Sequence, residues 1–288
     1  MSQTVEKLKV TNCLRLVDAG DTSESSNFMG KDEDRIGIVS TALGKAASKY
    51  YLHHKAPFEM REGARGLRDE LSGAKKTGGE EEAAVAEVIR VVSYCTEMDE
   101  LPVRHNEENL NEDLSLLLRW GATGEMDFLD PHCKCWLLIQ AWLDDTQELP
   151  ISDYVNDTKL VVDQLGRLFA AMLTVSCGDG EALKDGMVDV AAAILTASSC
   201  IRRRCYPPRD CLFQQISGIV GKGDFEDREA RCARFMDRGG WGSLRELREK
   251  SLGGSDDQFL KKLKSAGGFK AGYILEGLSR VPFVEVRA

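Results

Sequence analysis

Apolar and polar side chains alternate in two short stretches near the start of the chain. The alternation over 13–17 (CLRLV) has the period of two residues that is typical of a β-strand, and a second short strand is predicted over 35–39. A polar loop rich in serine, glycine and aspartate lies between them, from 19 to 34. The two strands are therefore expected to pair as a hairpin wing.

A helix is predicted directly after this hairpin, because Ser40 or Thr41 can cap its first turn. It is expected to reach His54, and Pro57 should end it. Its predicted apolar face consists of Leu43, Ala47, Tyr50 and Tyr51. The stretch that follows, 61–82, is rich in glycine, lysine and glutamate, and this composition predicts a linker.

Five further helices are predicted from apolar periodicity and capping residues. They cover about 81–94, 107–120, a helix that begins at Asp130-Pro131, 156–176 and 184–203. Aspartate followed by proline is a clear start signal, because the carboxylate caps the first turn and proline needs no N–H partner there. Pro207-Pro208 interrupts this pattern, and short helices between glycine turns are expected beyond it. The last residues, 282–287, predict one strand.

The composition is that of a soluble globular protein, with 42% apolar and 30% charged residues. The longest apolar stretch, 187–201, is shorter than the roughly 20 residues of a membrane span. The N-terminus has no apolar segment of the kind found in secretory signals. Nine cysteines without a regular spacing indicate reduced thiols, and hence a nuclear or cytoplasmic location.

The net charge of −9 is unevenly distributed along the chain. From residue 180 onward there are 19 lysines and arginines and 15 acidic residues, which leaves 19 basic and 32 acidic residues in 1–179. Phosphate contacts supply most non-specific affinity for nucleic acid, so the acidic part is a poor binder as a whole. Contact with RNA or DNA would need a local patch or the second half of the chain.

Two glycine-containing stretches have some features of a phosphate-binding loop, but neither has the full pattern. In 37–45 the glycines are too far apart, and Ala46 stands where a magnesium-binding serine or threonine is needed. The 218–223 stretch fails for similar reasons, and no DExD/H box is present. We therefore expect this chain to have no catalytic residue, no ATPase activity of its own and no bound cofactor.

The run His132-Cys133-Lys134-Cys135 contains residue types that ligate metals. A structural zinc site needs four ligands, usually as two spaced pairs, and no second pair follows here. Cysteines two positions apart on a helix also point to different sides. We therefore expect these cysteines to be core or surface thiols, and we expect no metal site.

A basic run, Arg202-Arg203-Arg204, ends the predicted 184–203 helix. Two interpretations stay open. Cations at the C-terminal end of a helix interact favourably with the helix dipole, and such a run is often only a solvated helix end. The same run lies in the more basic half of the chain, where it could contact the phosphates of a nucleic acid.

Four segments, in this order, resemble the C-terminal half of a helicase cassette from the large DExH RNA helicases. They are 39–52 (VSTALGKAASKYYL), 101–107 (LPVRHNE), the stretch from 128 to 141, and 157–167. The 101–107 segment is the most specific of them. We expect it to be a structural turn, in which Arg104 and His105 satisfy backbone carbonyls and neighbouring carboxylates.

The resemblance implies a mainly α chain with five parts. These are the C-terminal part of a winged-helix domain (1–60), a linker (61–82), the helical ratchet bundle of a Brl or Sec-63 homology domain (83–206), a helix-hairpin-helix-like region (207–280) and the first strand of an immunoglobulin-like sandwich (281–288). The family's two motor domains, which hold ATP and magnesium, would precede residue 1.

The resemblance also implies that the 156–176 helix corresponds to a ratchet helix, which lies across the single strand leaving the motor. Lys159, Asp163 and Arg167 fall at i, i+4 and i+8, and so form one stripe of that helix. An arginine there could stack on bases or hold phosphates. The alternative is a surface stripe with an internal Lys-Asp-Arg chain of ion pairs.

Two functions follow from these observations, and the sequence leaves both open. The chain could guide single-stranded RNA or DNA, with weak affinity, beside the motor domains of a parent helicase. It could instead be a protein-interaction scaffold without nucleic-acid binding, because the Brl domain also occurs in a protein-translocation component that binds no RNA. Other protein subunits are expected partners in both cases, and a membrane is not.

Overall fold

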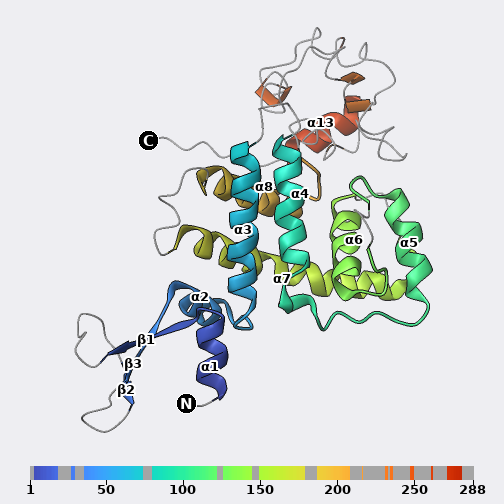
Figure 1. Cartoon of the computed structure of the whole chain (residues 1–288). Helices are drawn as coiled ribbons and strands as arrows, with labels where there is room; N and C mark the ends of the chain where they lie inside the picture. The colour runs from blue at the N-terminus through green and yellow to red at the C-terminus, as the bar shows by residue number, and fades with distance from the viewer. Residues whose placement is uncertain are drawn as a thin grey trace. The chain divides into compact units, whose positions relative to one another are not determined.

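The computed structural model describes residues 3–18, 27–29, 36–73, 80–121, 126–144, 149–178, 187–207 and 271–280, together with a few single residues between 216 and 261. The described part is mainly helical, as predicted (Figure 1). The chain divides into two compact units. The first consists of Met1–Gln140 with Leu149–Ser199, and the second of Ala141–Glu148 with Cys200–Ala288.

The N-terminal part of the first unit is a short helix followed by a small sheet. The elements are α1 (Gln3–Val10), β1 (Leu14–Asp18), β2 (Asn27–Met29) and β3 (Ile36–Ser40). The strand order is β1-β3-β2, and both pairings are antiparallel, with Leu16 opposite Ile38 in the first. The predicted hairpin is thus confirmed. The prediction of a loop throughout 19–34 is wrong, because Asn27–Met29 adds a third strand to the sheet.

Helix α2 (Ala42–Tyr50) begins where the sequence predicts and ends earlier. The Thr41 side chain caps it by accepting a hydrogen bond from the Gly44 amide at 3.2 Å. The helix ends at Tyr51, whose φ of 53° and ψ of 49° are left-handed and turn the chain out of the helix. The prediction that Tyr51 belongs to the apolar face is therefore wrong, and the buried residues are Leu43 and Ala46.

The predicted linker over 61–82 is wrong for 61–73, because α3 (Ala56–Gly73) is an 18-residue helix, and 74–79 lie outside the described residues. The buried residues recur along one face of it at helical spacing: Met60, Ala64 and Leu67. A Cβ atom at Gly63 would lie 2.6 Å from both γ-methyl carbons of Val91 in α4 (Glu80–Ser93). This glycine therefore allows α3 and α4 to approach each other closely. It does not mark a linker.

The rest of the first unit is a bundle of helices. After η1 (Thr96–Met98) come α5 (Glu107–Leu117), α6 (Pro131–Leu143), α7 (Ser152–Cys177) and α8 (Met187–Arg203). The expected cap of α6 is present, because Asp130 Oδ1 accepts a hydrogen bond from the His132 amide at 2.9 Å. Helices α3 and α4 lie side by side, and both pack on α7 (Figure 1).

Helix α7 is the central element of this unit. By length and composition alone it is long and apolar enough to cross a membrane. It also packs on α2 and α3, however, and it buries residues along its whole length, from Tyr154 to Ser176. A long apolar helix that is buried in this way is the core helix of a globular unit.

In the second unit, the Trp142 indole donates a hydrogen bond to the Ile201 carbonyl at 3.0 Å. Helix α13 (Ala271–Arg280) buries Ile274 and Leu278. The predicted strand over 282–287 and most of the predicted helix-hairpin-helix region over 207–280 lie outside the described residues.

Candidate nucleic-acid interface

The outer face of α7 carries two of the three residues predicted for the ratchet stripe. Lys159 and Asp163 are exposed, and Leu160 between them is 56% exposed. The predicted alternative, a chain of ion pairs along the helix, is wrong. Within the described residues Lys159 and Asp163 form no ion pair, and Arg167 pairs instead with Glu97 of η1 at 2.8 Å.

Arg167 joins α7 to the end of α2. Its Nη1 donates to the carbonyls of Tyr50 and Tyr51 at 3.2 and 2.8 Å, and its Nη2 donates to Glu97 Oε2 and Gln164 Oε1, both at 2.8 Å. The last carbonyls of a helix have no partner inside the helix, and Arg167 supplies one. Arg167 therefore has a structural role at the C-terminus of α2. Its role in strand binding stays a prediction.

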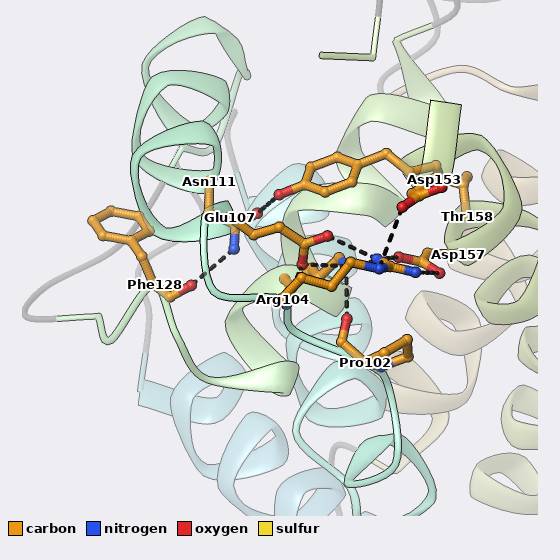
Figure 2. A network of polar contacts seen from close by, with 10 residues as sticks. Pro102, Arg104, Glu107, Asn111, Phe128, Asp153, Asp157 and Thr158 are labelled. Carbon is orange, nitrogen blue, oxygen red and sulfur yellow. Dashed lines mark hydrogen bonds and ion pairs between the residues drawn. The ribbon is translucent and has the colours of Figure 1, made fainter. Parts of the chain in front are cut away.

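A buried cluster of charged residues holds the inner side of α7 (Figure 2). Its centre is Lys134 of α6, whose side chain is fully buried. The Lys134 Nζ atom donates to Glu107 Oε2 at 2.7 Å, to Asp157 Oδ2 at 2.6 Å and to the Pro102 carbonyl at 2.7 Å. The three donors of the ammonium group thus each have an acceptor, as a buried cation requires. These contacts connect α6 with α5, α7 and the turn before α5.

Arg104 closes the cluster on its solvent side. Its Nη1 donates to Glu107 Oε1 at 2.7 Å and to Asp157 Oδ2 at 2.8 Å, and its Nε lies 3.3 Å from Asp153. The predicted structural role of the 101–107 turn is thus confirmed for Arg104. It is wrong for His105, which is exposed and forms no hydrogen bond or ion pair with any described residue.

The two cations, Lys134 and Arg104, balance the charge of the two buried carboxylates, Glu107 and Asp157, whereas Asp153 is exposed. Burial by itself would raise the pKa of Glu107 and Asp157. The hydrogen bonds from Lys134 and Arg104 outweigh burial, and the pKa of each carboxyl group lies below its ordinary value. The cluster is therefore ionised at neutral pH.

An uncharged chain of hydrogen bonds continues from this cluster towards α5. The Tyr154 hydroxyl donates to Asn111 Oδ1 at 2.6 Å, and Asn111 Nδ2 donates to the Phe128 carbonyl at 2.8 Å (Figure 2). Burial and the carboxylates of the cluster raise the pKa of Tyr154, so the phenol stays protonated and remains a donor. Lys134 Nζ lies 4.6 Å from the centre of its ring.

Lys134 was not among the predicted site residues, because the neighbouring residue types, Cys133 and Cys135, suggested metal binding instead. Cys133 and Cys135 are buried, and burial raises the pKa of Cys133 to about 12, so these residues are protonated thiols. Within the part of the chain that the structure describes, no group of three or more His, Cys, Asp or Glu side chains is arranged to hold a metal ion. The signal in the sequence is that Lys134 is the one Lys, Arg, Asp or Glu residue of α6.

The basic run at the end of α8, Arg202 to Arg204, lies in the second unit. Arg204 stacks its guanidinium group 4.0 Å from the ring centre of Trp142, and it has a left-handed φ of 51°. Arg202 and Arg203 are exposed. Arg203 forms no ion pair with a described residue. Of the three, Arg204 therefore has a packing role, and phosphate contact by the run stays a prediction.

Comparison with known proteins identifies the family. Residues 76–288 match the family model described as the Sec63 Brl domain. The chain belongs to this family. Three of the four segments that resemble DExH helicases meet in the buried cluster: Arg104 and Glu107 come from the second, Lys134 from the third and Asp157 from the fourth. The cluster is therefore a structural centre of the Brl domain in this chain.

Three relatives confirm the resemblance to large DExH RNA helicases. Activating signal cointegrator 1 complex subunit 3 of Rattus norvegicus is 34% identical over 157 residues, which are 54% of this chain and 6% of that protein. DExH-box ATP-dependent RNA helicase DExH14 of Arabidopsis thaliana is 35% identical over 158 residues, 54% of this chain and 6% of that protein. RQC trigger complex helicase SLH1 of Saccharomyces cerevisiae is 33% identical over 145 residues, which are 48% of this chain and 7% of that protein. The chain thus spans only about 6 or 7% of the length of these relatives.

Proposed function

We propose that this chain is a non-motor accessory module of a DExH-box RNA helicase, which guides single-stranded nucleic acid beside the motor domains of a parent protein. Those domains would bind ATP and Mg²⁺ and carry out the hydrolysis. The names of the relatives describe an ATP-dependent RNA helicase, the helicase of a complex and a subunit of a complex, which supports other protein subunits as partners. A nuclear or cytoplasmic location stays a prediction from the cysteine content.

One observation carries the proposal: α7 has a fixed inner side and an open outer side. The buried cluster holds Asp157 on the inner side, and Arg167 attaches the helix to α2. On the outer side, Lys159 and Leu160 are exposed and offer a cation next to an apolar surface. Positive charge beside apolar surface is what a protein needs to contact a single strand without reading its sequence.

A second function, the protein-interaction scaffold, is favoured by the charge distribution. Residues 1–179 contain 19 basic and 32 acidic residues, and Asp163 lies within the outer stripe of α7. Acidic groups repel the phosphate backbone, so the affinity of the isolated chain for a strand will be weak. A complete lack of strand binding at low salt would support the scaffold.

The test uses the full chain and a fluorescein-labelled oligouridylate, with binding followed by fluorescence anisotropy at low ionic strength. Lys159→Glu should weaken binding more than Arg203→Glu, since only the first lies on the stripe of α7. Both side chains are exposed and form no ion pair with a described residue, so neither change should disturb folding. Affinity should also fall steeply as salt is added, because phosphate contacts release counterions. Equal effects of the two reversals would mean diffuse electrostatics and would refute guidance by α7.

A further inference from the structure

Tyr51 occupies a backbone position at which glycine is the usual residue. It follows the last residue of α2, with φ 53° and ψ 49°. Its amide bonds to the carbonyls of Ala47 and Ser48, and the Leu52 amide bonds to the Ala47 carbonyl at 2.9 Å. This is the left-handed helix ending that strongly favours glycine, because a Cβ atom strains the backbone there.

Packing inside the protein does not explain the tyrosine. Its side chain is 89% exposed, and it forms no hydrogen bond with a described residue. The preceding residue behaves differently, because the Tyr50 hydroxyl bonds to Thr174 of α7 at 2.9 Å. Backbone strain that the fold does not require, at a residue whose ring faces solvent, points to a function outside the fold.

The surroundings of Tyr51 favour a negatively charged partner. Lys49 and Lys55 are exposed on either side of it in the chain, and His53 is exposed as well. The neighbouring carboxylate of Glu97 is neutralised by Arg167 at 2.8 Å. Arg167 also holds the Tyr51 carbonyl at 2.8 Å, so the Tyr51 backbone lies beside the last residue of the predicted stripe of α7 that begins with Lys159.

We infer that Tyr51 is a stacking platform for one base of a single-stranded nucleic acid, and that Lys49 and Lys55 contact the adjoining phosphates. An aromatic ring accepts any base, and flanking cations hold the backbone, so the site would be indifferent to sequence. The inference rests on the proposed function and extends the path of the strand from α7 to the end of α2. The left-handed backbone, fixed by Arg167, keeps the ring in the solvent, where a base can reach it.

Tyr51→Gly separates this function from folding. Glycine suits the left-handed backbone, and the exposed ring has no packing to lose, so the melting temperature should stay the same or rise. Affinity of the full chain for a labelled oligouridylate should nevertheless fall, by about fivefold to 150-fold for one lost stacked base. Tyr51→Phe should bind like the unaltered chain, and Tyr51→Asn, which also tolerates this backbone, should bind like Tyr51→Gly. Tyr273→Ala, which removes another exposed tyrosine, on α13, is the matched control and should bind normally.

The outcomes distinguish this inference from the proposed function. If the unaltered chain binds no oligouridylate at low salt, both the proposed guidance of single strands and the Tyr51 platform are refuted. If Lys159→Glu weakens binding and Tyr51→Gly does not, only the platform is refuted. A lower melting temperature of Tyr51→Gly would make the ring structural. Unchanged oligonucleotide binding together with weaker association with the parent's motor domains would assign the ring to a protein contact, and would also overturn the inference.

Discussion

Lys134→Met removes the central cation of the buried cluster and keeps a side chain of similar length. The ammonium group now donates to Glu107, Asp157 and the Pro102 carbonyl. Without it, two carboxylates that are almost fully buried keep only Arg104, whose side chain is 41% exposed, as a charged partner. The folded state of Lys134→Met therefore still carries the desolvation free energy of the two buried carboxylates, but it lacks the buried ammonium group that offsets this free energy most.

Removing one partner of a buried ion pair costs about 3–5 kcal/mol of stability. The remaining contact with Arg104 places the expected loss near the lower end of this range, at about 3 kcal/mol. For a domain of 150–250 residues, each kcal/mol shifts the melting temperature by roughly 2–4 °C, so a decrease of about 6–12 °C is expected. Urea unfolding followed by circular dichroism gives the free energy directly. Lys159→Met, which removes an exposed lysine from the same unit, is the control and should change stability by less than about 0.5 kcal/mol.

The cause of the lost stability can be identified from how the difference in unfolding free energy between the unaltered chain and Lys134→Met depends on pH. In the unaltered chain the pKa values of Glu107 and Asp157 are lowered by folding, so the cluster stabilises the protein at neutral pH and this stability is lost as the pH falls below about 4. Without Lys134, burial raises these pKa values relative to the unaltered chain, and protonation relieves the penalty. The difference in unfolding free energy between the unaltered chain and Lys134→Met should therefore become smaller from pH 7 to pH 4. This account would be refuted if Lys134→Met lost less than about 1 kcal/mol of stability at pH 7, or if the difference in unfolding free energy became larger as the pH falls.

Three further tests use urea unfolding, the last with a matched control variant. Arg167→Gln should cost about 1–3 kcal/mol and speed hydrogen exchange in the last turn of α2, because the Tyr50 and Tyr51 carbonyls lose their donor; normal exchange there would contradict the attachment. His105→Ala should change stability by less than about 0.5 kcal/mol, and a larger loss would contradict the absence of contacts between His105 and the described residues. Gly63→Ala should cost about 1–3 kcal/mol by collision with Val91, whereas Gly66→Ala on the same helix, with open space around it, should gain about 0.5–1 kcal/mol. Equal effects of the two would contradict the close approach of α3 and α4.

The secondary structure that could be predicted is the part encoded by local signals. Asp130 caps α6 through its own side chain, and the strand alternation over 13–17 gives β1 within one residue. Helix α3 was missed because a segment that contains several glycines has the composition expected of a linker. Whether Gly63 breaks a helix or admits a neighbouring one depends on Val91 in α4, and local composition contains no information on that partner.

The candidate site shows the same limit for charged residues. Spacing of i, i+4 and i+8 places Lys159, Asp163 and Arg167 on one stripe, but it does not say what approaches the stripe from outside. Arg167 is occupied because the chain turns at Tyr51, a residue 116 positions away.

Lys134 presents the opposite case, because its burial could have been inferred. A lysine between Cys133 and Trp136 in an apolar helix cannot be solvated if that helix is in the core, and a buried cation needs carboxylate partners. The segments that most resemble the helicases contain two candidates at positions otherwise unexplained, Glu107 and Asp157. Charge balance within the core, applied to those segments together, would therefore have predicted the cluster. Periodicity applied to each helix separately could not.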